Sequence, residues 1–379
     1  MKLLLASDSY KGSLNTMQVA EQIKRGVKKV FPDAQFMCVP VADGGEGTVE
    51  AMVSSLGGEY RNVEVTAPDG RKVQAVYGVL PDRKVVVEMA AASGLPLIPD
   101  KERNVMTATT YGTGELIQAA LNEDCTQIYI GIGGSATNDG GMGMAQALGY
   151  SFRDKDGKEV GFGGKELGRV AVIDNKNADQ RLKEKDIIVM CDVTNPLCGE
   201  LGAAAIYGPQ KGATPEQIIE LDHGLKHFAK VIKEQMGLDL EEIPGAGAAG
   251  GLGAGLIAFA GAKIKSGIDA ILEVSDFNEK LNWADIVITG EGRIDCQSAF
   301  GKAISGISKM AKAKDVPVVA VSGSIEHGAE IIYEKGVSTM EAAVCRPMHV
   351  DEAMLNANIL VENAVERVMR SIKIGQEIM

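Results

Sequence analysis

The chain has 379 residues, of which 45% are hydrophobic, and it carries a formal net charge of −12 at pH 7. This length favours two domains, and the acidic balance argues against nucleic acid or an anionic membrane surface as the main partner. The cysteines form no C-x-x-C pair, and a chain of this size does not need disulfides to fold. The amino-terminal apolar run ends at Asp8, too early for a signal peptide, so we expect a cytoplasmic protein.

Two strand–helix pairs are predicted over the first sixty residues. A buried strand over 3–6 leads into a helix that begins near residue 15 and ends before Pro32. A second strand over 36–41 leads into a helix over 48–56. Strands and helices that alternate in this way open a doubly wound α/β sheet.

The pattern changes after residue 60, where strand-like segments are separated by PDG and PDR turns that predict an antiparallel meander. The middle of the chain predicts strands over 60–65, 73–79 and 84–89, a helix over 114–121, strands over 128–132 and 187–191, a helix over 215–235 and a glycine-rich helix over 251–262. The carboxyl-terminal part returns to alternating strands and helices, with strands over 286–289, 318–322 and 342–345.

These elements predict a fold of the α/β class with two domains. Residues 1–62 and 265–379 are expected to form a discontinuous doubly wound domain with a parallel sheet, of the Rossmann or flavodoxin type. Residues 63–264 are expected to form a mixed α/β domain inserted into the first one, and this domain would carry the glycine-rich phosphate loops.

The stretch GIGGSATNDGGMGMAQALG, residues 131–149, follows a predicted strand and enters a helix. Backbone N–H groups in such a loop can form a nest for an anion at the positive end of the helix. The consecutive N–H groups in question are those of Gly133, Gly134 and Ser135. Asn138 and Asp139 have two interpretations, either turn formation within the loop or contact with a phosphate or metal.

A literal G-x-G-x-x-G, the fingerprint of dinucleotide binding, occurs as GAGAAG at residues 245–250. The preceding DLEEIP is acidic and ends in proline, so no buried strand leads into this loop. We therefore favour phosphate binding or close helix packing for Gly247 and Gly250. An NAD-dependent oxidoreductase stays as an alternative of a different class.

Three polar loops follow predicted strands of the doubly wound domain: DSYKGS (8–13), ADGGEG (42–47) and GEGRIDCQSAFGK (290–302). Ligands bind at the carboxyl ends of the strands in such sheets, so we expect these loops to lie together. Lys11 and Arg293 would supply positive charge there. The candidate substrate-binding residues are Asp8, Ser9, Lys11, Arg293 and Asp295.

Another loop, CDVTNPLCG, follows the strand over 187–191 and places Asp192 directly after it. Asp192 has two interpretations, a turn cap or a carboxylate that accepts the proton of a substrate hydroxyl. His223 and His227 stand four residues apart without H-E-x-x-H, which favours a solvated helix face over a metal site. Neither the P-loop pattern nor the protein-kinase motifs occur in the chain.

Taken together, these loops resemble the bacterial type I glycerate kinase family. The matching stretches are DSYKGSL, PVADGGEGTVEAM, EMAAASGLPLIP, TYGTGELIQAAL, GIGGSATNDGGMGM, CDVTNPL, YGPQKGA, GAGAAGGLGAG and ITGEGRID-x-Q-S-x-x-GK. The chain departs from the family pattern at Ser7, Met142 and Ser298, none of which removes a candidate catalytic group. The resemblance implies a two-domain enzyme that phosphorylates D-glycerate with ATP, most often at the 2-hydroxyl.

The resemblance also suggests roles for individual residues. Lys11 and Arg293 would hold the carboxylate of glycerate and balance charge, and the glycine loop would hold the nucleotide phosphates. Asp192 or Asp43 would act as the base, with Asp192 favoured, and Asp43 would help to hold Mg²⁺ through water. Phosphorylation at the 3-hydroxyl and a non-catalytic protein that binds an organic acid remain alternatives.

Overall fold

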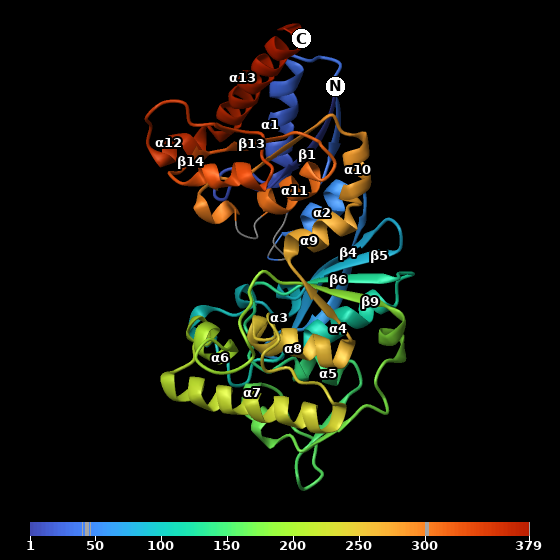
Figure 1. Cartoon of the computed structure of the whole chain (residues 1–379). Helices are drawn as coiled ribbons and strands as arrows, with labels where there is room; N and C mark the ends of the chain where they lie inside the picture. Colours follow the sequence, from blue (N-terminus) through green and yellow to red (C-terminus); the bar gives the residue numbers. More distant parts are fainter. Residues whose placement is uncertain (40, 42–44, 46, 300–302, 379) are drawn as a thin grey trace. The chain divides into compact units, whose positions relative to one another are not determined.

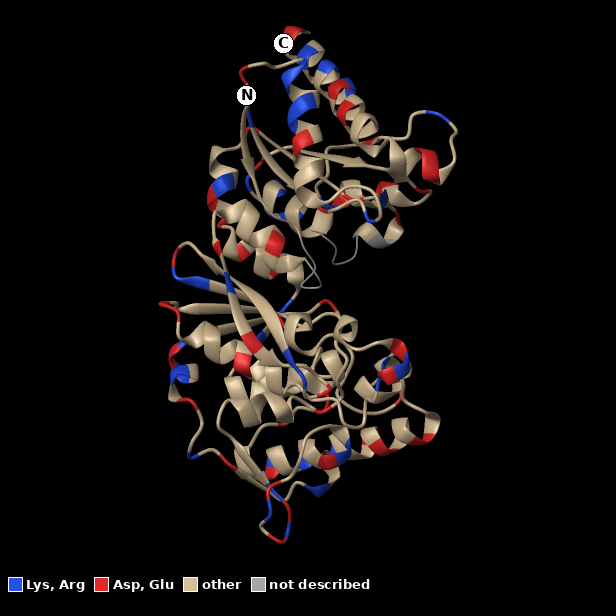
Figure 2. Ribbon diagram, turned by 180° about the vertical axis from the view of Figure 1, so that it is seen from behind, with Lys and Arg blue, Asp and Glu red and all other residues tan. Residues whose placement is uncertain are grey.

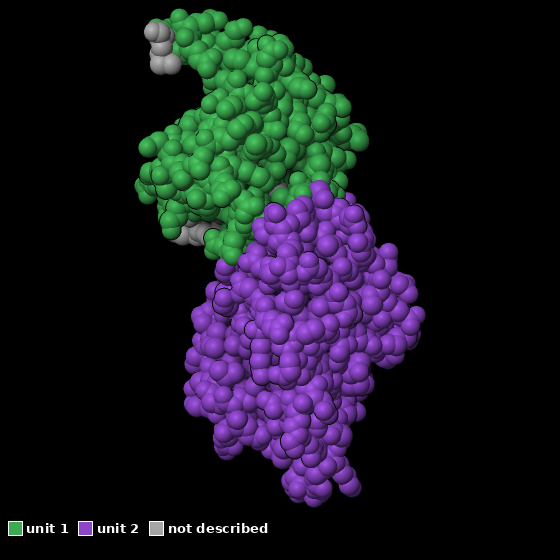
Figure 3. All heavy atoms as spheres, turned by 90° about the vertical axis from the view of Figure 1, so that its right-hand side faces the viewer, with its two compact units in different colours: residues 1–42, 54–56, 268–379 green, residues 43–53, 57–267 purple. Residues whose placement is uncertain are grey.

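The computed structural model of the chain describes residues 1–39, 41, 45, 47–299 and 303–378, and for residues 297 and 299 the backbone alone. The chain divides into two compact units, which Figure 3 shows in different colours. Unit 1 comprises residues 1–42, 54–56 and 268–379, and unit 2 comprises residues 43–53 and 57–267. Of the described helices, none is long and apolar enough to cross a membrane.

Unit 1 is built on a five-stranded parallel sheet with the strand order β2-β1-β11-β13-β15. Its strands are β1 (Lys2–Ser7), β2 (Gln35–Cys38), β11 (Ile286–Gly290), β13 (Val318–Ser322) and β15 (Thr339–Ala342). The order reverses at β1, so the topological switch point lies between β1 and β11. This is the flavodoxin-type arrangement, and the predicted doubly wound parallel sheet is confirmed.

Helices cover both faces of the unit 1 sheet because alternate strand residues point to opposite sides. Leu3 and Leu5 face α1 (Thr16–Lys28) and α13 (Ala357–Ile378), which lie side by side in Figure 1. Leu4 faces the opposite layer, and this layer consists of α9 (Gly267–Val274), α10 (Phe277–Trp283), α11 (Ala303–Lys312) and the 3-10 helix η7 (Ala329–Lys335). The short helix α12 (Val350–Leu355) precedes α13. The strands β1, β11 and β13 carry almost no charged residues, as Figure 2 shows.

Unit 2 contains a six-stranded mixed sheet with the order β3-β4-β5-β6-β9-β10. Its strands are β3 (Glu59–Thr66), β4 (Lys72–Leu80), β5 (Lys84–Glu88), β6 (Gln127–Gly131), β9 (Asp186–Met190) and β10 (Lys263–Lys265). The first three strands form the predicted antiparallel meander, and β5, β6, β9 and β10 run parallel. The carboxyl ends of four strands therefore meet at one edge of this sheet.

One large hydrophobic core fills unit 2 between the sheet and its helices. These helices are α4 (Tyr111–Leu121), α5 (Met142–Ala147), α7 (Pro215–Met236) and α8 (Ala248–Ala260). Smaller elements complete the chain: α2 (Thr48–Leu56), α3 (Ala90–Ser93), α6 (Ala203–Tyr207), the hairpin β7 (Ser151–Arg153) with β8 (Val172–Asp174), the pair β12 (Arg293–Ile294) with β14 (Ser324–Ile325), and the 3-10 helices η1 (Leu95–Leu97), η2 (Asp100–Glu102), η3 (Gly164–Arg169), η4 (Gln180–Glu184), η5 (Pro209–Lys211) and η6 (Cys296–Ala299).

The unit limits differ from the predicted domain limits around α2. Residues 43–53 and 57–62 were expected with the doubly wound sheet but belong to unit 2. The cause is close packing of α2 on β4, since a methyl group at Gly78 would lie only 2.4 Å from the Val53 side chain. The Glu88 carboxylate also accepts a hydrogen bond from the Val49 N–H, with 2.6 Å between oxygen and nitrogen.

The last strand of unit 1 was also misplaced. The structure puts it at β15 rather than over 342–345, because parallel pairing with β13 aligns Thr339 with Val319 and ends at Ala342. The absence of a strand before GAGAAG is confirmed, since the described segment between α7 and α8 contains only turns and extended chain. The dinucleotide fingerprint thus lacks its strand.

Candidate active site

A pocket of about 280 Å³ lies in unit 2 at the carboxyl ends of β6 and β9. This volume is just below the usual range for ligand sites, about 300–1,000 Å³. The loops that follow these two strands meet here, as the position of glycine-rich loops at strand ends predicts. The lining residues are Gly45, Ile132, Gly133, Gly134, Ser135, Met190, Cys191, Asp192, Val193, Tyr207, Gln210, Lys211, Ala248 and Ala249.

The loop after β6 presents backbone N–H groups in this pocket. The Gly134 carbonyl accepts a hydrogen bond from the Leu95 N–H at 2.8 Å, and the Ala136 N–H donates to the Ser93 carbonyl at 3.0 Å. These bonds fix the loop against η1 and α3, and Gly134 adopts a positive φ of 75°. No described residue accepts a hydrogen bond from the N–H groups of Gly133, Gly134 and Ser135. Unpaired N–H groups in a fixed loop have the character of an anion-binding nest.

Lys211, at the end of η5, lines the pocket although its side chain is only 1% exposed. Its Nζ donates to the Thr137 carbonyl at 2.6 Å and to Ser135 Oγ at 3.3 Å. Burial lowers the pKa of Lys211 to about 7, and the charge of Asp139 partly opposes this shift. Sequence inspection missed this residue, which stands in the motif YGPQKGA without any special spacing.

Asp192 also lines the pocket, directly after β9. One of its carboxylate oxygens accepts a hydrogen bond from the Gly267 N–H at 2.8 Å. The residue thus holds Gly267, the first residue of α9, as a cap would, and it also lines the pocket. Both interpretations offered by the sequence are compatible with this position. Nearby, the Tyr207 hydroxyl donates to Asn195 Oδ1 at 2.6 Å.

Asp139 lies behind the glycine loop and is fully buried. Its carboxylate accepts hydrogen bonds from the N–H and hydroxyl of Thr110, at distances from 2.8 to 3.1 Å, and from the N–H groups of Gly141 and Gly143, at 3.1 and 3.3 Å. Burial raises the pKa of Asp139, and the hydrogen bonds from Thr110 oppose the rise. The structure therefore gives Asp139 a supporting role within its own loop, in line with the turn interpretation.

Three other predicted phosphate contacts are also placed in the interior. Asn138 is fully buried, and no described residue hydrogen-bonds to its side-chain amide. A methyl group at Gly247 would lie 2.1 Å from the Pro196 carbonyl oxygen, and one at Gly250 would lie 1.9 Å from that of Thr137. Close packing explains both glycines, and none of these three residues lines the pocket.

The start of α8 forms one wall of the pocket and has an unusual backbone. Ala249, Gly250 and Gly251 are consecutive left-handed residues, with φ of 54°, 70° and 85°. Only glycine adopts this region without strain, so the conformation of Ala249 is held against an intrinsic cost. The Ser135 hydroxyl lies within hydrogen-bond distance of the Ala249 carbonyl, at 3.3 Å.

The remaining candidate residues lie in unit 1, at its topological switch point. The loops after β1 and β11 are neighbours there, since a methyl group at Gly292 would lie 3.6 Å from the backbone nitrogen of Lys11. The Asp8 carboxylate accepts a hydrogen bond from the Ser9 N–H at 2.6 Å. Arg293 is paired with Asp295 at 3.6 Å, and its side chain is 65% exposed.

The five predicted substrate-binding residues are thus brought together on neighbouring loops of unit 1. The Ser298 hydroxyl, in the same region, donates to the Glu291 carboxylate. Asp43, the other predicted base and the predicted metal contact, lies outside the described residues. Within the described part of the chain, no group of three or more His, Cys, Asp or Glu side chains could hold a metal ion.

Comparison with known proteins gives consistent results over the whole chain. A model described as the glycerate kinase family matches residues 3–373. A glycerate kinase from Halalkalibacterium halodurans is 48% identical over 367 residues, which cover 97% of each chain. A glycerate 2-kinase from Escherichia coli K12 is 47% identical over 376 residues, or 99% of each chain. A crystal structure from Salmonella typhimurium LT2, whose name assigns it to glycerate kinase 2, has a TM-score of 0.89 at 44% identity and full coverage of both chains.

Proposed function

Because the chain belongs to the glycerate kinase family, we propose that it transfers the γ-phosphoryl group of ATP to the 2-hydroxyl of D-glycerate. Membership of this family makes the chain an enzyme, a kinase that phosphorylates glycerate, and confirms the resemblance inferred from its motifs. ATP as the phosphoryl donor and the 2-hydroxyl as the acceptor are the proposed refinements. The choice of the 2-hydroxyl is supported by the similarity to the E. coli glycerate 2-kinase.

The observation that carries the proposal is the pocket at the carboxyl ends of β6 and β9. Phosphoryl transfer depends on positioning and charge neutralisation rather than on covalent catalysis. The pocket combines the open N–H groups of the loop after β6 with the Lys211 side chain, and both types of donor bind phosphate oxygens. We infer that the nucleotide phosphates bind against Gly133, Gly134 and Ser135.

Asp192 is the proposed general base. The 2-hydroxyl oxygen would attack the γ-phosphorus while its proton passes to the Asp192 carboxylate, and the bond from phosphorus to the β–γ bridging oxygen would break to release ADP. The bond from Gly267 N–H to one carboxylate oxygen holds the side chain at the pocket. The Asp192 carboxylate would accept the proton.

Magnesium would enter with the nucleotide, as it does in most kinases, and would neutralise charge on the β- and γ-phosphates. Such a site needs only one or two protein carboxylates, so it does not require a larger acidic cluster among the described residues. Asp43 as a contact through water stays part of the proposal.

The carboxylate of glycerate is assigned to Lys11 and Arg293 of unit 1. These residues lie on neighbouring loops at the switch point, where doubly wound sheets bind ligands. Arg293 can pair with a carboxylate in a bidentate manner.

The cytoplasmic location expected from the sequence is also part of the proposal.

Phosphorus NMR of the product formed from ATP and D-glycerate tests the proposal. We expect 2-phosphoglycerate and ADP in equal amounts. The appearance of 3-phosphoglycerate would contradict the proposed acceptor hydroxyl, and the absence of phosphorylated glycerate would contradict the proposed reaction. Replacing ATP by other phosphoryl donors in the same assay tests the donor.

A further inference from the structure

Lys211 is an unusual residue because lysine side chains are rarely buried without a carboxylate partner. Its Nζ has two hydrogen-bond acceptors, the Thr137 carbonyl and the Ser135 hydroxyl, and both are neutral. Its hydrogen-bond partners among the described residues include no Asp or Glu, and Asp139 acts on it only through its charge at longer range. The structure thus places a lysine in the pocket, and among the described residues its charge has no carboxylate partner in direct contact.

The number of N–H groups on the Lys211 amine indicates what kind of ligand would complete its hydrogen bonding. A neutral amine has two N–H groups, which match the two acceptors that Lys211 has in the structure. Protonation adds a third N–H, for which no described residue provides an acceptor. An anion in the pocket would supply both this acceptor and the opposing charge. The Ser135 N–H belongs to the same pocket and can donate to that anion.

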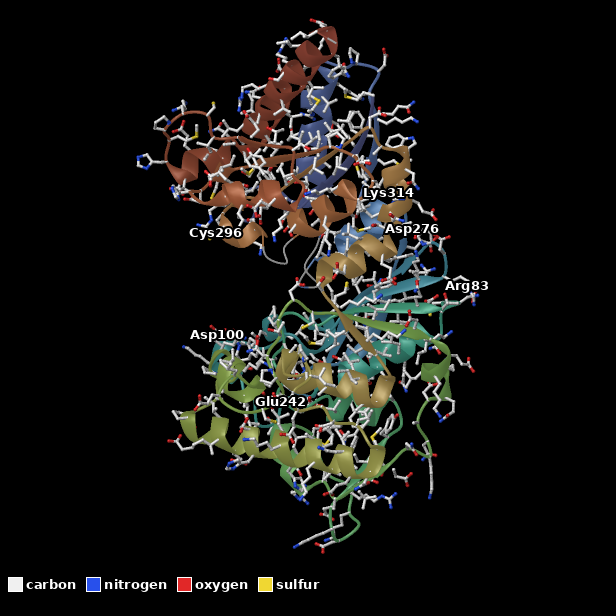
Figure 4. All side chains as sticks on the ribbon, in the orientation of Figure 1. Arg83, Asp100, Glu242, Asp276, Cys296 and Lys314 are labelled. Atoms are coloured by element: carbon white, nitrogen blue, oxygen red, sulfur yellow. The ribbon has the colours of Figure 1, made fainter. Side chains whose placement is uncertain are left out.

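Within the described part of the chain, the other charged or titratable groups around Lys211 come from four elements. Asp139 is on the loop after β6, Cys191 and Asp192 are on the loop after β9, and Tyr207 is on α6. Arg103 lies behind η5, where its guanidinium donates to the Gln210 carbonyl at 3.3 Å and pairs with Asp100, which Figure 4 labels at the surface. Burial lowers the pKa of Lys211 to about 7 despite Asp139.

We propose that Lys211 is the phosphate receptor of the unit 2 pocket, and that it takes up one proton from solvent when a phosphate group binds beside Ser135. The inference rests on the proposed function for the identity of the ligand. Beyond that function, it states that ligand binding is coupled to protonation of Lys211. The phosphate would come either from the nucleotide or from the phosphorylated product, since both carry the same group.

Proton uptake is measured by isothermal titration calorimetry at pH 8.5 in buffers with different ionisation enthalpies. The full chain is titrated with MgADP in one series and with D-2-phosphoglycerate in the other. Phosphate monoesters have a second pKa of about 6, so the ligands themselves exchange few protons at this pH. We expect uptake of about one proton per bound ligand, because Lys211 is mostly neutral in the free protein above pH 7.

The same mechanism predicts the pH dependence of affinity. Above pH 7 the protonated fraction of free Lys211 falls about tenfold per pH unit, so the Kd should rise about tenfold between pH 7.5 and 8.5. In Lys211→Arg the guanidinium stays charged, so its Kd should stay flat and its proton uptake should disappear. Lys211→Met should lose affinity at every pH. Lys230→Met, at an exposed position of α7, should behave like the unchanged protein.

If protons are taken up only when MgADP binds, Lys211 binds a phosphate of the nucleotide. If protons are taken up only when phosphoglycerate binds, Lys211 binds the phosphate of the product. Binding of both ligands without proton uptake in the unchanged protein would overturn the inference, while leaving the proposed reaction intact. This measurement needs no variant, so a folding defect in Lys211→Arg would not affect it. Phosphoryl transfer is tested separately by product analysis, so a failure there is distinguishable.

Discussion

The positively charged candidate residues are exposed to solvent in unit 1 and buried in unit 2. In unit 1, Lys11 and Arg293 stand on loops at the edge of a fully parallel sheet, and the Arg293 side chain is 65% exposed. In unit 2, Lys211 is 1% exposed and Asp139, within the glycine-rich loop after β6, is fully buried. Exposed charges are screened by solvent and salt, whereas buried ones interact strongly and are fixed in place.

This difference suggests a division of labour. Exposed, adaptable cations suit the capture of a small carboxylate, and they contribute to ground-state binding. A pocket with fixed N–H donors and a buried lysine suits the stabilisation of charge that develops during transfer. Substitutions in unit 2 should therefore change kcat, stability or the affinity for ligands that carry a phosphate, and those in unit 1 should mainly change KM for glycerate.

The largest effect is expected for Asp192→Asn in unit 2. Loss of the proposed base should lower kcat by about 10²–10⁴-fold, the usual contribution of general base catalysis. Asparagine keeps an oxygen for the Gly267 N–H, so the fold should be unaffected. Steady-state kinetics provide the measurement. A variant that keeps more than about a tenth of the activity would exclude Asp192 as the base.

Asp139→Asn should lower kcat less than Asp192→Asn does, but it should destabilise the folded protein strongly. The change replaces one acceptor oxygen by an NH₂ group that faces the buried N–H donors of the loop. Each unsatisfied buried donor costs about 1–3 kcal/mol, so we expect a loss of about 3 kcal/mol or more in the free energy of unfolding. Urea-induced unfolding measures it, with Asp124→Asn, at an 83% exposed side chain, as the control. Equal losses in both variants would refute the supporting role.

Arg293→Ala tests the other half of the comparison. Removal of one proposed carboxylate contact should raise KM for D-glycerate about tenfold, equivalent to about 1.4 kcal/mol, while kcat and KM for ATP stay nearly unchanged. The exposed pair with Asp295 contributes little to stability, so unfolding should not change. An unaltered KM for glycerate would remove Arg293 from the carboxylate site.

The smallest effect concerns backbone strain beside the pocket. Ala249→Gly should stabilise the protein by about 0.5–1 kcal/mol, because it relieves a left-handed alanine at some cost in chain entropy. In unit 1, Asp276→Gly should gain less, since Asp tolerates this region better than Ala does. Asp276 is labelled in Figure 4. Thermal unfolding of both variants measures the two stabilisation energies. A larger stabilisation by Asp276→Gly than by Ala249→Gly would contradict the prediction.

Features that depend on local sequence were predictable. The helix start at Asn15 is confirmed by a reciprocal cap, in which Asn15 and Gln18 exchange two hydrogen bonds of 2.9 Å. The antiparallel meander of unit 2 is also confirmed, because its turns are short and rich in Pro, Asp and Gly. The convergence of the loops after β6 and β9 follows from parallel strand order alone.

Features that depend on distant contacts were not predictable. The role of Asp139 is set by Thr110, which is 29 residues away in the chain. Lys211 looks like a surface lysine in a polar loop, and its burial depends on the loop after β6, more than 70 residues earlier. The strand β10, with the sequence KIK, is too short and polar to be recognised. In each case packing between remote segments decides the outcome.

The division between the two units is tested most directly by NMR of the ¹⁵N-labelled protein during ligand titration. MgADP should shift the amide signals of Gly133, Gly134 and Ser135, whose N–H groups have no acceptor among the described residues. D-glycerate should instead shift the signals of Lys11 and Gly292. If MgADP leaves the three signals of unit 2 in place, the nucleotide phosphates do not bind there, and the proposed site is wrong.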